Sequence, residues 1–192
     1  TQYGGGGTDQ AYDCAVDLLG NVYMSGKTQS TQSISTVGCH QLNYGGGGYD
    51  VFLASFTAAG VRNWGTYYGG SGDEESWGCS VHKSGHIFVT GLTSSNTGTI
   101  IATVSSHQPN HGGSTWDCFI AQFDPSTNGA RTWGTYYGGS SDDVGYGCTS
   151  DNAYHVYLTG SAFSSTGNDI ASAGSHQPLY GGGAFGDAFI AK

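Results

Sequence analysis

The sequence predicts an all-β protein built from about three tandem copies of one four-stranded antiparallel unit. Glycine is abundant, at 35 of 192 residues against 3 prolines, which is typical of a chain dense in tight turns. Charged residues make up 10% of the chain, well below the usual level of about 25%, so long solvated helices are not expected. The third observation is a repeated segment, which indicates a repeat architecture.

The repeat is clearest in the segment Trp-Gly-Thr-Tyr-Tyr-Gly-Gly, which occupies residues 64–70 and again 133–139, with residues 1–5 as a trimmed first copy. Its threonines, Thr1, Thr66 and Thr135, are 65 and 69 residues apart. Other landmarks keep the same phase: Cys14, Cys79 and Cys148, each two residues after an aromatic; His40, His107 and His176; and Asp50, Asp117 and Asp187. We therefore divide the chain into repeats at 1–65, 66–134 and 135–192.

Four short strands are predicted in each unit. In the first unit these cover residues 14–16, residues 22–25, the apolar run that starts at Asp50, and the segment around Trp64. The second strand is expected to end on a glycine, which is Gly26, Gly91 or Gly160 in the three units. Four antiparallel strands at a fixed period are the pattern of a propeller blade or a stacked array of sheets.

Three stretches, residues 17–26, 50–56 and 62–70, resemble the bacterial β-propeller repeat called SBBP. The Ser-His-Gln-Pro loops at 106–109 and 175–178 resemble the version found in large secreted or surface proteins of Bacteroidota-type bacteria. The resemblance covers essentially the whole chain. It implies a blade architecture and an extracellular location, and it implies no catalytic residues.

Three blades are too few to close a propeller, which usually has about 4–8 of them. The chain also begins near a fourth strand and ends on a third strand, so the last unit lacks its closing strand. Two arrangements remain open: the chain is part of a longer blade array, or the N-terminal strand of one subunit completes the open unit of the next, head to tail, in a ring or a filament. Residues 1–4 have neither the basic start nor the apolar stretch of a signal peptide, so any such signal has been removed or lies upstream.

The charge balance narrows the choice of partners. The formal net charge is −9, with only five basic residues, which argues against nucleic acid and against anionic membrane surfaces. No apolar run approaches the about 20 residues of a membrane helix, so membrane insertion is not expected. Cations and neutral glycans are the more natural partners.

Acidic residues follow the Gly-Gly turns and give one candidate metal site in each unit. Clustered carboxylates suit Ca²⁺, and the alternative is a solvated loop that caps the turn. The calcium candidates are Asp9, Asp73, Glu74, Asp142 and Asp143. No other cofactor is expected. Each unit has one histidine that keeps the repeat phase, and a packed or hydrogen-bonded role suits it better than zinc binding.

Several residues have an expected structural role. Asp50, Asp117 and Asp187 are expected to accept backbone N–H bonds where the third strand begins. Trp64 and Trp133 are expected in the core. Cys14, Cys79 and Cys148 are expected as small buried thiols, and the pairing of the five cysteines, which include Cys39 and Cys118, stays open.

The sequence contains no nucleophile elbow, no His-Glu-x-x-His and no phosphate-binding loop, so no enzymatic activity is expected. The predicted function is a non-catalytic extracellular structural or adhesive repeat protein. The alternative is a lectin-like module that binds glycans through exposed aromatic side chains. The glycan-binding candidates are Tyr49, Trp77, Trp116 and Tyr146.

Overall fold

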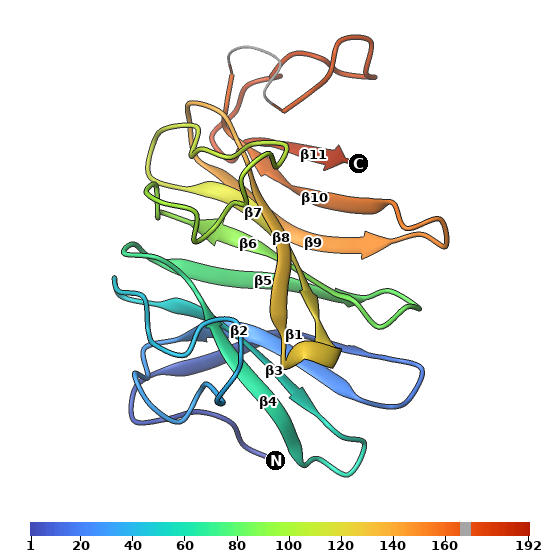
Figure 1. The fold of residues 1–192 in the computed structure, drawn as a ribbon. Helices are drawn as coiled ribbons and strands as arrows, with labels where there is room; N and C mark the ends of the chain where they lie inside the picture. The colour runs from blue at the N-terminus through green and yellow to red at the C-terminus, as the bar shows by residue number, and fades with distance from the viewer. Residues whose placement is uncertain (166–169) are drawn as a thin grey trace.

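The computed structural model describes residues 1–165 and 170–192 as eleven strands in three antiparallel sheets (Figure 1). The first sheet contains β1 (Asp9–Val16), β2 (Val22–Thr28), β3 (Asp50–Phe56) and β4 (Arg62–Tyr68). The second contains β5 (Glu74–Val81), β6 (Ile87–Thr93), β7 (Asp117–Asp124) and β8 (Ala130–Tyr137), with the short 3₁₀ helix η1 (Pro125–Thr127) between its last two strands. The third contains β9 (Asp143–Ser150), β10 (Val156–Ala162) and β11 (Asp187–Ala191).

The expected all-β fold of repeated antiparallel units is confirmed. In every sheet the strand order follows the chain order, the first two sheets have four strands and the third has three, and none closes into a barrel. The described residues contain no α-helix, and none of their helices is long and apolar enough to cross a membrane. The repeat boundaries drawn at 65/66 and 134/135 fall inside β4 and β8.

The three sheets are stacked in chain order, with the N-terminus beside the first sheet and the C-terminus at the end of β11 (Figure 1). The largest apolar cluster lies between the first and second sheets and contains Leu53, Trp64, Val89 and Phe119. A smaller cluster around Ile120 and Leu158 joins the second and third sheets. Trp64 is buried as expected, whereas Trp133 is only half-buried.

The first strand is longer than the sequence indicates, since β1 starts at Asp9 and not at residue 14, and the first strand of each unit contains a β-bulge. In the first sheet the pairing of β1 with β2 skips one residue, Tyr12, between Ala11 and Asp13. The bulged residues of the other two sheets are Trp77 and Tyr146, at the same place in the repeat. A bulge bends its strand and re-aims the extra side chain, so these three aromatics leave the normal in–out alternation.

The expectation that the second strand ends on glycine is wrong. Gly26 lies inside β2, Gly91 inside β6 and Gly160 inside β10, and each strand continues for two more residues. Each glycine lies across from the bulge, where a Cβ atom would collide with a backbone carbonyl oxygen of the first strand. Glycine is therefore required by close approach of two backbones, and it does not mark the end of the strand.

The cysteines are all free thiols, so the open question of a disulfide is answered in the negative for this structure. Cys79 and Cys118 are buried, and Cys39 and Cys148 are partly covered. The prediction of a buried thiol is wrong for Cys14, which is exposed because none of the described sheets packs on the outer side of the first sheet as the first sheet packs on the second.

Replacing Gly91 by Ala is expected to destabilise the protein by about 3 kcal/mol, because the new Cβ must displace the backbone of β5 at the bulge. Urea unfolding followed by tryptophan fluorescence measures this change. Gly6→Ala is the matched control, since no atom lies within 4 Å of the point that its added Cβ would occupy, and it should change stability by less than about 0.5 kcal/mol. Equal stability of the two variants would contradict the bulge explanation.

Candidate functional site

A tyrosine at the end of each fourth strand joins one unit to the next. Its hydroxyl donates a hydrogen bond to a carbonyl in the long loop of the following sheet: Tyr3 to Ile34 O at 2.5 Å, Tyr68 to Ile101 O at 2.6 Å and Tyr137 to Ile170 O at 2.6 Å. Its ring packs on a phenylalanine of the following third strand: Tyr3 on Phe52, Tyr68 on Phe119 and Tyr137 on Phe189, each with ring centroids 5.3 Å apart. The N-terminal segment therefore contacts the first sheet as a fourth strand contacts the sheet that follows it.

The tyrosine just before it in the Tyr-Tyr pair points the other way and hydrogen-bonds to a loop of its own sheet. Tyr67 donates to Ser30 O and Tyr136 to Ser95 O, both at 2.7 Å. Gln41 and Gln108 also bind the fourth strand. The backbone oxygen of each glutamine accepts the N–H of this first tyrosine, Tyr67 or Tyr136, at 3.1 Å. The side-chain oxygen accepts the N–H of Gly69 or Gly138.

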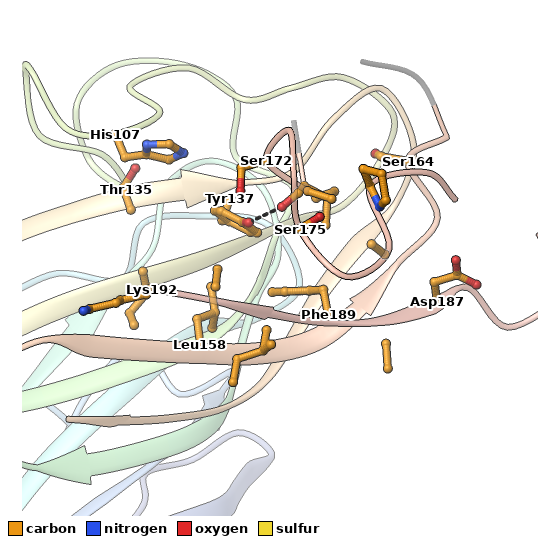
Figure 2. Close-up of a pocket in the computed structure, with 18 of the residues that line it drawn as sticks. His107, Thr135, Tyr137, Leu158, Ser164, Ser172, Ser175, Asp187, Phe189 and Lys192 are labelled. Atoms are coloured by element: carbon orange, nitrogen blue, oxygen red, sulfur yellow. Dashed lines mark hydrogen bonds between the residues drawn. The ribbon is translucent and has the colours of Figure 1, made fainter. Parts of the chain in front are cut away.

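The third sheet holds a groove where the other two sheets carry a fourth strand. Its volume is about 1110 Å³, and it lies between the second and third sheets (Figure 2). Tyr137, Leu158 and Phe189 line it, together with the loop that contains Ser164. In Figure 2 these side chains come from different strands and line the same space.

The corresponding space between the first and second sheets is filled by side chains of the second sheet. Phe123 from β7 and Tyr136 from β8 are both fully buried there. The outer face of β11 is not covered by another of the described sheets: Ile190 has 72% of its surface exposed, whereas Leu53 and Ile120, at the same place in β3 and β7, are packed against the following sheet and have 0% and 6%. β11 is also the edge strand of the third sheet among the described residues. The third sheet thus presents an apolar groove and an open edge together.

A carboxylate at the start of each first strand ties the preceding turn to the sheet. Gly5 N donates to Asp9, Gly70 N to Glu74 and Gly139 N to Asp143, each at 2.8 Å. Threonine or serine hydroxyls supply further bonds, such as Thr93 to Glu74 at 2.7 Å and Ser164 to Asp143 at 2.6 Å. These three calcium candidates are surrounded by hydrogen-bond donors.

The other two calcium candidates hold the glycine-rich loop of the preceding sheet. Asp73 accepts the N–H of Gly48, and Asp142 accepts the hydroxyl of Ser114 at 2.6 Å and the N–H of Trp116 at 3.1 Å. Across residues 1–165 and 170–192, no group of three or more His, Cys, Asp or Glu side chains is arranged to hold a metal ion. Calcium binding stays a prediction.

The aspartates that open the third strands anchor the glycine-rich loop just before them. Asp50 accepts the N–H of Gly45 at 2.6 Å, and the same contact joins Asp117 to Gly112 and Asp187 to Gly181. Asp50 and Asp117 are fully buried, and their Oδ1 atoms have no hydrogen-bond partner within the described structure. Burial, followed by weaker repulsion from nearby carboxylates, raises the pKa of both to about 7.

The carboxylate at the start of the next sheet lies close to each of these two buried aspartates. A Cβ atom added to Gly138 would lie 2.8 Å from Asp117 Oδ1 and 2.9 Å from Asp143 Oδ2. A Cβ atom added to Gly69 would lie between Asp50 and Glu74 in the same way. Two buried acids therefore face each other at both interfaces between sheets. The His111 ring is 3.6 Å from Asp117 at the second interface, while Tyr44 takes the position of this histidine at the first.

The repeated histidines pack against the tyrosine of the fourth strand. His40 lies 6.0 Å from Tyr68 and His107 lies 5.9 Å from Tyr137, measured between ring centroids. Burial lowers the pKa of His40 to about 4, so its ring is neutral at physiological pH.

The structure brings two of the four glycan-binding candidates together. Trp77 and Tyr146 are in edge-to-face contact at 6.1 Å, and Tyr12 stacks flat on Trp77 at 4.9 Å. Tyr49 is linked to this cluster through Lys27, whose ammonium lies 4.3 Å from the centroid of the Tyr49 ring and 5.8 Å from that of Tyr12. Trp116 is half-buried beside Asp142. Sequence reasoning did not select Tyr12 as a site residue, although its position two residues before Cys14 matches the other two.

Replacing Asp50 by Asn is expected to flatten the pH dependence of stability. The pKa of Asp50 is raised in the folded state, so the folded protein binds this proton more tightly than the unfolded chain does. The stability from this proton is present at low pH and is lost as the pH rises through about 7. Between about pH 5 and pH 8 the part of this loss that comes from Asp50 is about 2 kcal/mol, measured by urea unfolding as the difference between the native protein and the variant. Asp117, whose pKa is raised in the same way, contributes its own part to both proteins.

Asp187→Asn is the matched control, because Asp187 is only half-buried and none of the sheets formed by residues 1–165 and 170–192 covers it. This variant should keep the pH dependence of the native protein. A native protein equally stable at both pH values would contradict the role of the facing acids.

Comparison with known proteins agrees with the repeat type. A family model described as a beta-propeller repeat, SBBP, matches residues 1–31. The matched segment comprises the residues before β1, then β1 and β2, and so includes Tyr3, Asp9 and the bulge at Tyr12. A search of curated proteins gives no match. The first unit of this all-β chain is thus similar to a β-propeller repeat.

Proposed function

We propose that this protein is a non-catalytic structural repeat module, whose third sheet binds the fourth strand of a further repeat unit. The observation that carries the proposal is the groove of about 1110 Å³ beside the open edge of β11. In the second sheet the same place is covered by β8, whose Tyr136 is buried between two sheets. The bound strand has the pattern Trp-Gly-Thr-Tyr-Tyr-Gly-Gly and adds to the sheet by backbone hydrogen bonds.

The module acts outside a bacterial cell, as a scaffold or adhesive part of a surface protein. The resemblance of the repeat to those of large secreted and surface proteins supports this location. The net charge of −9 favours neutral or cationic partners over nucleic acid. The further repeat unit belongs to a longer chain or to a second molecule, since the same strand pattern satisfies the groove in both cases.

A peptide copying residues 130–139 tests the proposal. A fluorescein-labelled peptide of this sequence should bind the protein saturably, as measured by fluorescence anisotropy, because it supplies the tyrosine that fills the groove. Alanine in place of the first tyrosine of the peptide should weaken binding about tenfold to a hundredfold, by loss of a buried ring and its hydrogen bond to Ser164 O.

The second tyrosine of the same peptide is the internal control. In the chain its counterparts face the following sheet, so alanine at this position should weaken binding much less. The proposal fails if the peptide does not bind, or if both tyrosine replacements weaken binding to the same extent.

Glycan binding is a second candidate, favoured by the contact of Tyr12, Trp77 and Tyr146 across the three first strands. These side chains are 38%, 37% and 53% exposed and form one aromatic cluster. Part of each ring already packs on its neighbour, so sugar rings have only the remaining faces for stacking. On a glycan array, saturable binding that Trp77→Ala abolishes would establish this function, and no binding to any glycan would exclude the cluster as a lectin site.

A further inference from the structure

The long loop of the first sheet, residues 29–49, places a histidine ring against the second sheet. The His40 ring lies between Tyr68 of β4 and Phe123 of β7, with ring centroids 6.0 Å and 5.9 Å away. Its Nε2 atom is buried and has no hydrogen-bond partner among the described residues. We infer that His40 is an acid-sensitive latch, whose protonation releases the long loop of the first sheet from the second sheet.

The latch lies in the joint between the first two sheets. Tyr68 and Phe123 are fully buried in the largest apolar cluster, and their rings meet edge to face at 5.4 Å. His40 adds a third ring to this pair. Both sheets that form the joint are described, so the surroundings of the ring are complete within the chain.

The neutral form of His40 suits this place and the charged form does not. A neutral imidazole can carry its single proton on Nδ1 and leave Nε2 without a hydrogen. Protonation adds an N–H group at Nε2, where the structure offers it no acceptor. A buried charge without a hydrogen-bond partner is costly, so the proton favours a form in which the ring has left its pocket.

The charges around the ring act in the same direction. The guanidinium of Arg131 lies 5.7 Å from the centroid of the same Tyr68 ring, and it is held there by carbonyls of the second long loop, such as Ile101 O at 2.8 Å. Burial, followed by repulsion from Arg131, lowers the pKa of His40 to about 4.

The other titratable neighbours do not offset this repulsion. Burial keeps the Tyr68 phenol neutral by raising its pKa, and Cys39 is the adjacent residue of the same loop. Among the described residues, no carboxylate forms an ion pair with His40. A proton on His40 therefore meets a cation and aromatic rings but no acid.

The next residue connects the latch to the fourth strand of the first sheet. Gln41 N donates to Thr66 Oγ1 at 2.9 Å, and Gln41 O accepts the N–H of Tyr67 at 3.1 Å. Its side-chain oxygen accepts the N–H of Gly69 at 3.1 Å. Because His40 and Gln41 are consecutive, release of the His40 ring breaks the bonds that protect the amides of Gln41 and Tyr67.

The direction of the pH dependence follows from the lowered pKa. The open form, with an ordinary histidine pKa of about 6.5, binds the proton more tightly than the closed form. Opening is therefore favoured as the pH falls below about 6.5, and the effect grows until the pH reaches about 4. Between about pH 7 and pH 5 the equilibrium constant for opening should rise about twentyfold.

Amide hydrogen exchange followed by NMR at these two pH values tests the latch. The rates are expressed as protection factors, which remove the direct effect of pH on the chemistry of exchange. Protection at Gln41 and Tyr67 should fall about twentyfold at the lower pH. Val89, in the middle of β6 and paired on both sides, should keep its protection.

Two variants separate this histidine from the others. His40→Phe keeps an aromatic ring in the pocket and removes the titration, so Gln41 and Tyr67 should stay protected at about pH 5. His86→Gln, in the turn between β5 and β6, is the matched control for loss of a histidine outside the joint, and it should respond to pH as the native protein does.

The inference is overturned if the native protein shows equal protection at both pH values, if His40→Phe loses protection as the native protein does, or if Val89 loses protection to the same extent as Gln41. A titration of the His40 ring by NMR in the native protein decides the matter without any variant. A midpoint below about pH 5 supports the latch, and a midpoint above about pH 6 excludes it.

Discussion

A tyrosine hydroxyl bound to a carbonyl of the following sheet holds this structure together. The contact occurs at Tyr3, Tyr68 and Tyr137, with the ring on a phenylalanine of the next third strand each time. Tyr68 and Tyr137 belong to the apolar layers between consecutive sheets, where each links a fourth strand to the sheet that follows. The facing acids and the packed histidines lie within those layers, so their burial depends on this contact.

The bulge in each first strand is the second constraint. It brings the backbones of the first and second strands so close that only glycine fits at Gly26, Gly91 and Gly160. It also turns Tyr12, Trp77 and Tyr146 toward one another across neighbouring sheets. The same local irregularity thus explains a repeated glycine and a repeated aromatic, which lie in different strands.

The repeat period was enough to predict three antiparallel units and an incomplete third one, because duplication places equivalent residues in equivalent elements. Strand ends were less predictable. Gly26 looks like a terminator in the sequence, since close approach of Gln10 O across the sheet leaves no trace in the local pattern. The contact between Tyr12 and Trp77 was equally hidden, because it depends on how two sheets stack and on a bulge that changes the side-chain alternation.

At the candidate site, the sequence indicated an unfinished unit but not its chemistry. The orientation of Gln177, the groove beside Phe189 and the exposure of Ile190 become visible only when the second and third sheets are compared residue by residue. They change an unfinished unit into a defined acceptor, with an apolar space for one tyrosine and a loop that binds the strand backbone. The function proposed for the chain follows from this difference between its second and third sheets.

Amide hydrogen exchange in β11 tests the central claim most directly, because the outward N–H groups of an edge strand are protected only when another strand pairs with them. The account predicts that exchange at residues 187–191 slows when the peptide of residues 130–139 is added, while exchange in β3 and β7, which are already paired on both sides, stays unchanged. Exchange in β11 that is unaffected at saturating peptide would contradict it.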